Sequence, residues 1–180
     1  LPDLSIESQI SEIVKLQDKA TFTKGVAELW RKKSQTALQR SRDKYSFISP
    51  NELGKLSHPV PRMIAEIFQD IPEQDSLPNP ISNLLKFSSN LFGSNYEYLG
   101  NHAFLDIFLK KGYTTLAYSC YETIISLNLP IEQALTERLI YQLASNNQTT
   151  LIKEFLKKHP FTLNIMLRTC EPFILSGNLS

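Results

Sequence analysis

The stretch FLKKGYTTLAYSCYETIISLNLP, residues 108–130, has the pattern of two helices joined at a glycine. Gly112 separates one apolar run, which ends in two lysines, from a second apolar run that Pro130 closes. Glycine readily adopts the left-handed conformation in which many helices end. The stretch therefore predicts a helical hairpin, and the sequence around it decides whether the hairpin is single or repeated.

A shift of the sequence against itself by 35 residues gives this hairpin a partner. Asn147 then falls on Gly112, and asparagine is the other residue that tolerates a left-handed turn. The apolar positions that coincide are Phe104 with Leu139, Leu105 with Ile140, Phe108 with Leu143, Ala117 with Ile152 and Tyr121 with Leu156. A period of this length is typical of stacked helical hairpins, and an irregular helical bundle is the alternative. A further shift places Leu77 opposite Gly112, so the period does not extend upstream.

The rest of the chain also favours helices, because apolar residues recur at spacings of three and four and glycines number only 6. We expect helices over about residues 4–16, from Thr23 towards residue 47, and over 61–71, with a proline-rich break between the last two. The predicted class is all-α, with helical hairpins stacked as a short α-solenoid after additional N-terminal helices. Its parts are N-terminal helices over 1–71, a proline-rich linker over 72–80, and a hairpin domain over 81–180 with units of about 99–133 and 134–168.

Composition narrows the class of protein. The chain has 180 residues and a net charge of +1, which favours neither nucleic acid nor membrane over the whole molecule. No apolar run approaches the roughly 20 residues of a membrane span, so no transmembrane segment is expected. Cys120 and Cys170 lie far apart in a chain with enough apolar residues for a core, which favours a reducing compartment. The first residue is Leu1, so we expect a fragment or a processed protein whose targeting segment is not visible.

Charge is distributed unevenly along the chain. Residues 24–44 contain seven basic and two acidic residues, a balance of +5, whereas residues 51–107 have a balance of −4. The basic segment also contains Trp30, with Tyr45 and Phe47 close by, a combination that suits phosphates and bases. The alternative is a solvated helix face with Trp30 in the core. The candidate RNA-binding residues here are Lys24, Arg31, Lys32, Lys33, Arg40, Arg42 and Lys44.

Signatures of catalysis are absent from the sequence. The three histidines have no cysteine or histidine neighbours at metal-ligand spacing, and no phosphate-binding loop or nucleophile motif occurs. Glu66 and Asp70 stand four residues apart, but such pairs are usually surface residues. Cys120 lies in an apolar helix, where a buried, inert thiol is expected. We therefore expect no enzyme, no catalytic residue, no metal and no cofactor.

The 35-residue unit at about 99–133, which contains the stretch 108–130, resembles the pentatricopeptide repeat in its length and in Gly112, Ala117, Tyr121 and Ile124. The resemblance implies units of 35 residues whose fifth and last residues face single-stranded RNA in organelles. Those positions fall on Ala103 and Gln133 in the first unit and on Arg138 and Arg168 in the second. Arginine suits a phosphate, which requires charge and no base code, so Arg138 and Arg168 are further RNA-binding candidates.

Degenerate units of this kind resemble fungal mitochondrial factors of RNA metabolism. The resemblance implies a non-catalytic adaptor of the mitochondrial matrix. Such an adaptor would bind single-stranded mitochondrial RNA, the mitochondrial RNA polymerase or other gene-expression factors, coupling transcription with RNA processing, stability or translation regulation. No DNA partner is expected. The alternative is a cytoplasmic protein-protein scaffold in a membrane-tethering or coat complex, since stacked hairpins serve protein partners equally well.

Overall fold

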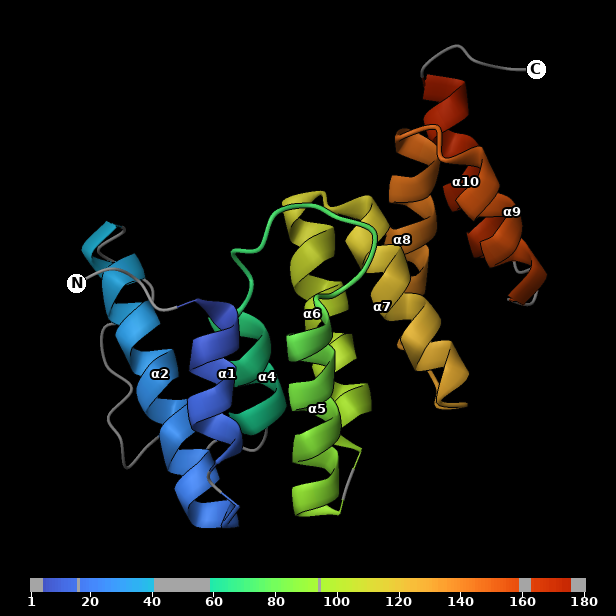
Figure 1. Ribbon diagram of the computed structural model, residues 1–180. Coiled ribbons are helices and arrows are strands. Elements are labelled where there is room, and N and C mark those ends of the chain that lie inside the picture. Colours follow the sequence, from blue (N-terminus) through green and yellow to red (C-terminus); the bar gives the residue numbers. More distant parts are fainter. Residues whose placement is uncertain (1–4, 16, 41–58, 94, 159–162, 176–180) are drawn as a thin grey trace. The chain divides into compact units, whose positions relative to one another are not determined.

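The fold is entirely helical over the residues that the structure describes. The computed structural model describes residues 5–15, 17–40, 59–93, 95–158 and 163–175. The helices are α1 (Ile6–Val14), α2 (Lys19–Arg40), α4 (Pro59–Ile67), α5 (Asn79–Phe92), α6 (Tyr96–Lys111), α7 (Thr114–Ser126), α8 (Gln133–Ser145), α9 (Thr149–Lys158) and α10 (Leu163–Leu175) (Figure 1). The all-α prediction is confirmed for these residues.

The chain forms two compact units, and the boundary lies within α6. The first unit comprises residues 1–72 and 77–104, and the second comprises residues 73–76 and 105–180. Residues 73–76 belong to the segment expected to be a linker, and Glu73 Oε1 accepts a hydrogen bond of 3.1 Å from the Leu116 N–H. That carboxylate therefore serves the first turn of α7, where N–H groups lack partners within the helix.

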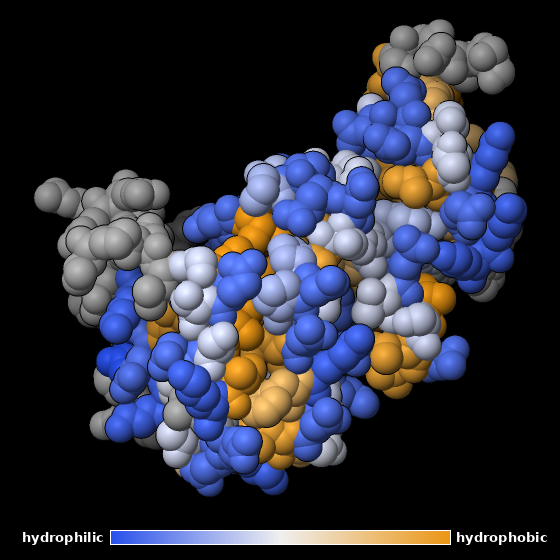
Figure 2. Space-filling view, viewed as in Figure 1, coloured by the Kyte–Doolittle hydropathy of each residue, from blue (hydrophilic) through white to orange (hydrophobic). Residues whose placement is uncertain are grey.

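In the first unit, α2 packs on α1 and α4, and α1 packs on α5. Figure 2 shows apolar surface in the seam between α1 and α5, with polar side chains covering the outward faces. Phe22 is fully buried, and its ring lies 5.6 Å from that of Phe87 and 6.0 Å from that of Phe92. The helices of this unit are thus held by large apolar side chains on their facing sides.

The start of α2 differs from the prediction. The helix begins at Lys19, four residues before Thr23. Asp18 is the reason, because its Oδ2 accepts hydrogen bonds from the Thr21 N–H at 3.0 Å and the Thr21 hydroxyl at 2.9 Å. A carboxylate before the first turn satisfies donors that the helix leaves open, and the same bonds lower the pKa of Asp18. The predicted end near residue 47 lies outside the described residues.

The two hairpins are α6–α7 and α8–α9; the second unit contains the end of α6 and all of α7, α8, α9 and α10, and α8 packs on α7, α9 and α10. Gly112 has a φ of +77° and Asn147 a φ of +54°, so both adopt the left-handed conformation, as their residue types predicted. At the first turn, Gly112 N–H donates to Leu109 and Tyr113 N–H to Phe108. At the second, Asn147 N–H donates to Ala144 and Gln148 N–H to Leu143, which are the same bonds moved by 35 residues. Both turns therefore have the hydrogen bonds of a Schellman motif.

Burial follows the same period. Three pairs of residues related by the 35-residue shift are fully buried in both members: Phe104 and Leu139, Leu105 and Ile140, and Phe108 and Leu143. In the second helices of the hairpins the match is less complete, because Tyr121 is buried whereas Leu156 is half-buried. Phe155, next to Leu156, is fully buried, and the centre of its ring lies 5.3 Å from that of the Tyr121 ring, with the two rings tilted by 34°. The two hairpins are thus equivalent at the turn and along their first helices.

Candidate functional site

One face of α8 carries three polar side chains that reach the preceding hairpin. Arg138, Gln142 and Asn146 are spaced by four residues, which places them along one side of the helix. Gln142 Nε2 donates to the Leu109 carbonyl at 2.5 Å, and Asn146 Nδ2 donates to the Thr114 hydroxyl at 2.8 Å. Arg138 Nη1 lies 3.1 Å from Asp106 Oδ1. These bonds join α8 to the end of α6 and the start of α7.

Asp106 sits between two cations. Its Oδ2 lies 3.2 Å from Lys110 Nζ, while its Oδ1 faces Arg138. The Lys110 side chain is 63% exposed and that of Arg138 39%, whereas that of Asp106 is only 21% exposed. We call Asp106, Lys110 and Arg138 the Asp106 cluster. It has a net charge of +1, and its carboxylate holds both cations at the surface, so it suits an anionic group such as a phosphate.

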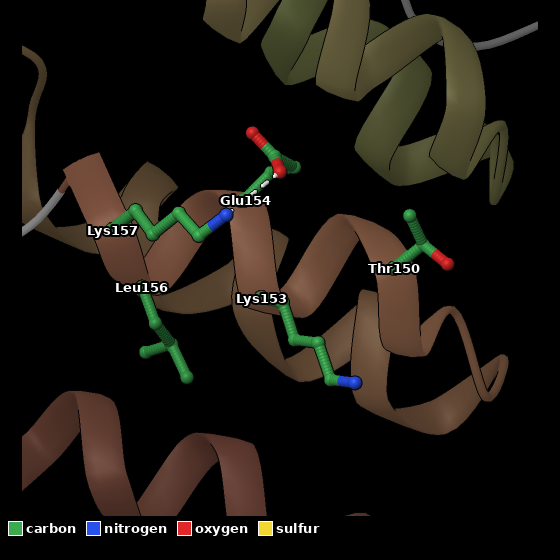
Figure 3. Close-up of a pocket in the computed structure, with 5 residues that line it drawn as sticks. All are labelled: Thr150, Lys153, Glu154, Leu156 and Lys157. Carbon is green, nitrogen blue, oxygen red and sulfur yellow. Dashed lines mark hydrogen bonds and ion pairs between the residues drawn. The ribbon is translucent and has the colours of Figure 1, made fainter.

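A second set of basic residues lies on α9. Figure 3 shows a surface hollow that is lined by Thr150, Lys153, Glu154, Leu156 and Lys157, all from this one helix. Lys157 Nζ lies 3.3 Å from Glu154 Oε1, while Lys153 is exposed. Because a single helix supplies every lining residue, the hollow is an open surface and lacks the converging walls of a small-molecule site.

The contacts of α9 with α7 involve Lys158. Its Nζ lies 3.2 Å from Glu122 Oε2 and 5.7 Å from the centre of the Tyr118 ring. Burial, followed by the charges of Glu122 and Glu154, raises the pKa of Tyr118 to about 12. Burial also raises the pKa of Cys120, so its thiol is protonated and unreactive near neutral pH.

Within the predicted basic segment, two side chains make contacts with other parts of the first unit. Trp30 is only 7% exposed, and its Nε1 donates to Glu66 Oε2 at 2.5 Å, so its ring is part of the core and is not available to a base. Lys33 Nζ donates to the Ile67 carbonyl at 2.7 Å and lies 5.2 Å from the centre of the Phe68 ring. Both residues hold α2 against α4.

The other predicted residues of this segment differ in exposure. Lys24 and Lys32 are exposed on α2, and Arg31 is half-buried. Arg40 is the last residue of α2, and the structure does not describe its side chain. Arg42 and Lys44, with Tyr45 and Phe47, lie outside the described residues. The described part of the segment thus presents Lys24 and Lys32 as its exposed cations.

The four positions suggested by the pentatricopeptide resemblance are not equivalent. Ala103 is buried and cannot touch a base. Gln133 is exposed and donates to Glu137 Oε1 at 3.3 Å. Arg138 belongs to the Asp106 cluster, whereas Arg168 lies on α10, where its Nη1 is 3.2 Å from Glu171 Oε2. Arg138 and Arg168 therefore have separate ionic partners.

Sequence reasoning missed Asp106, Lys110, Gln142 and Asn146 as members of this surface. The pair Asp106 and Lys110 had a visible signal, because opposite charges four residues apart meet on one helix face. The contacts of Gln142 and Asn146 had none, since their partners lie 33 and 32 residues away. Polar residues at four-residue spacing on a helix are compatible with plain solvent exposure.

The described residues form neither a metal-binding cluster nor a membrane-spanning helix. The part of the chain that the structure covers contains no group of three or more histidine, cysteine, aspartate or glutamate residues arranged to bind a metal. None of the helices described there combines the length and apolar character needed to span a bilayer.

Comparisons of the chain with protein-family models, with curated proteins and with solved structures returned no match. Over the described residues the fold is all-helical, with two hairpins whose turns are equivalent.

Proposed function

We propose that this protein is a non-catalytic helical adaptor of mitochondrial gene expression that binds single-stranded RNA, the mitochondrial RNA polymerase, or both. Its hairpins stack as a short α-solenoid of the pentatricopeptide type. The observation that carries the proposal is the equivalence of the Gly112 and Asn147 turns, which have the same left-handed residue and the same hydrogen bonds 35 residues apart. A 35-residue hairpin is the unit length of that repeat class.

The Asp106 cluster is the proposed phosphate contact. Lys110 and Arg138 come from the first helices of consecutive hairpins, and Asp106 fixes both cations at their shared surface. Arginine presents several donors in a plane that matches phosphate oxygens, while lysine supplies a compact charge. Arg168, with a side chain 51% exposed, offers a further cation on α10. These contacts read the backbone of RNA and carry no base specificity.

A salt series of binding to single-stranded RNA tests this proposal. For single strands the slope of log affinity against log salt is about −0.7 for each phosphate neutralised. Replacing both Lys110 and Arg138 with alanine should therefore weaken binding and reduce the slope by about 1.4. The matched control replaces Lys15 and Lys86, two exposed lysines of the first unit, which removes the same charge elsewhere. Equal losses in both double variants would indicate a nonspecific charge effect and would reject the Asp106 cluster as the contact.

The partner within the proposal is tested separately. Contact with the mitochondrial RNA polymerase is either direct or through RNA, and co-purification after ribonuclease treatment separates these cases. Binding to the polymerase that survives ribonuclease assigns the adaptor role to a protein contact. Fractionation of cells that express the full-length protein tests the matrix location against the cytoplasmic alternative. If the folded protein shows no salt-sensitive RNA binding and is found outside mitochondria, the adaptor proposal fails.

A protein-protein scaffold with no RNA role is the second candidate function. The observation in its favour is that five cations of the second unit have carboxylate partners: Lys110 and Arg138 share Asp106, Lys157 has Glu154, Lys158 has Glu122 and Arg168 has Glu171. Paired cations create a weaker field for a polyanion. The salt series with single-stranded RNA separates the two functions. A scaffold without an RNA role should show no salt-dependent affinity for RNA, whichever lysines or arginines are replaced.

A further inference from the structure

The tyrosines of the second unit differ in what their rings contact. Tyr113 lies against Phe108, with ring centres 6.2 Å apart, and Lys111 Nζ lies 5.7 Å from the centre of the Tyr113 ring. Tyr118 and Tyr121 are buried, with ring centres 5.4 Å apart. Tyr141 is half-buried, and within the described part of the chain its ring is in contact with no other aromatic ring and no cation. Its ring is therefore the one that is still open to a ligand.

Tyr141 lies beside Arg138 on the solvent side of α8. At about 100° per residue, Tyr141 and Gln142 lie on opposite sides of Arg138 around the helix, and Gln142 faces α6. Residues three apart on a helix are neighbours, with about 5–6 Å between their Cβ atoms. Long side chains on a helix lean towards its N-terminus, which directs the Tyr141 ring towards the turn that carries Arg138. The ring and the arginine thus leave α8 side by side.

The neighbours of Tyr141 on α8 leave room at its ring. Ser145, one turn later, is small, and its Oγ donates to the Tyr141 carbonyl at 2.8 Å. Glu137, one turn earlier, accepts a hydrogen bond from Gln133 at 3.3 Å. Arg138 Nη1 is held 3.1 Å from Asp106 Oδ1 on α6, on the side of Arg138 away from Tyr141. Each of these polar side chains therefore has a partner other than the ring.

The 35-residue period relates Tyr141 to Asp106. In the first hairpin this position holds the carboxylate that fixes Lys110 and Arg138, and in the second it holds an aromatic ring. Because α6 and α8 are the first helices of their hairpins, the two positions lie on corresponding faces. The surface therefore runs from the charges of the Asp106 cluster on α6, through Arg138, to the Tyr141 ring on α8.

From this order we infer that Arg138 and Tyr141 form a nucleotide subsite for single-stranded RNA, in which Arg138 holds a phosphate and Tyr141 stacks on an adjacent base. The inference rests on the proposed function and names how the same surface holds the bases. Stacking on an aromatic side chain strengthens binding by about 5- to 150-fold for each base, and every base has a face that can stack. The subsite thus adds affinity for unpaired bases without selecting a sequence.

Binding of a labelled oligouridylate to the 180-residue chain, followed by fluorescence anisotropy, tests the subsite. Tyr141→Leu keeps apolar bulk and removes the ring, so it should weaken binding about five-fold or more. The salt slope should stay unchanged, because no phosphate contact is lost, whereas Arg138→Ala should reduce the slope by about 0.7. Tyr141→Phe keeps the ring and should bind like the unmodified chain. Tyr96→Leu, which removes a half-buried ring from the first unit, should also bind normally.

Two altered ligands separate stacking from a packing role of Tyr141. An oligonucleotide of the same length with abasic sites keeps the phosphates and has no base to stack. Double-stranded RNA keeps its bases paired inside the helix. Both ligands should bind equally to the unmodified chain and to Tyr141→Leu, while the intact single strand distinguishes them. A packing role would instead weaken all three ligands together and change the circular dichroism of Tyr141→Leu.

The outcomes distinguish this inference from the proposed function. If the unmodified chain shows no salt-sensitive binding to RNA, the proposed function fails and the subsite fails with it. If salt-sensitive binding is present but Tyr141→Leu binds the intact single strand like the unmodified chain, the subsite alone is overturned. Equal losses in Tyr141→Leu and Tyr141→Phe, or in Tyr141→Leu and Tyr96→Leu, would also overturn it, because neither result depends on a ring at residue 141.

Discussion

Replacing Gly112 with alanine is expected to lower the free energy of unfolding of the second unit by about 1–2 kcal/mol, the cost of a left-handed conformation for a residue with a side chain. The φ of Gly112 is +77°, and a Cβ built there meets no heavy atom within 4 Å. The cost is therefore a property of the backbone conformation, because the substitution neither creates a clash nor removes a turn hydrogen bond. Asn147 already bears a Cβ at a φ of +54°, so Asn147→Ala should cost less than Gly112→Ala.

Gly93→Ala is the matched control variant in the first unit. It ends α5 with a φ of +61°, and its Cβ position is also clear of neighbours. Urea unfolding followed by far-ultraviolet circular dichroism measures all three variants, and fluorescence of Trp30, the single tryptophan, reports on the first unit alone. With a denaturant slope of about 2 kcal/mol per molar, a loss of 1–2 kcal/mol moves the midpoint by about 0.5–1 M.

Two outcomes would refute the conformational argument for Gly112. An unchanged midpoint would mean that the turn relaxes without cost into a right-handed conformation. A loss well above about 3 kcal/mol would mean that the side chain disturbs packing, against the open space around the Cβ position. If Asn147→Ala costs more than Gly112→Ala, the two turns are not equivalent, and the 35-residue unit loses its main support.

Three further substitutions test the packing of the two units. Trp30→Phe should cost about 1–2 kcal/mol in urea unfolding, because Glu66 loses the indole hydrogen bond at a partly buried site. Gly100→Ala should cost about 1–2 kcal/mol despite its helix position, because the new Cβ would lie 2.3 Å from Leu85 Cδ2, and a smaller residue at Leu85 should recover part of the loss. Tyr118→Phe should be neutral or slightly stabilising at pH 7, because the buried Tyr118 hydroxyl has no hydrogen-bond partner among the described residues. Since the folded pKa of Tyr118 is about 12 and its ordinary value is 10.0, the unmodified chain should lose stability as the pH rises from 10 to 12, and Tyr118→Phe should lose less.

The sequence predicted those features of the fold that leave a local mark. The turns at Gly112 and Asn147 were visible because a left-handed φ restricts the residue type, and the class was visible in the apolar spacing. The start of α2 was also marked, by the carboxylate of Asp18, although the prediction began the helix later. Local rules therefore account for the elements and the hairpin turns.

The candidate site was less predictable, because its contacts join residues that are distant in sequence. Arg138 was identified from a resemblance, but nothing near it in the sequence indicated the bond to Asp106, 32 residues earlier. Lys33 belonged to a run of basic residues, and its use by the Ile67 carbonyl depends on how α2 meets α4. A count of charges along the chain cannot distinguish a cation that faces solvent from one that closes a helix contact.

The equivalent turns at Gly112 and Asn147 also determine which length of insertion this fold would accept. A tandem copy of 35 residues, taken from just after Gly112 to Asn147, would begin and end at the same left-handed position, so the first helix of the inserted hairpin would repeat the buried pattern of its neighbours. An insertion of another length would rotate the following helix and turn the face of Arg138, Gln142 and Asn146 away from its partners. Growth by whole hairpins is therefore the change that this architecture tolerates best.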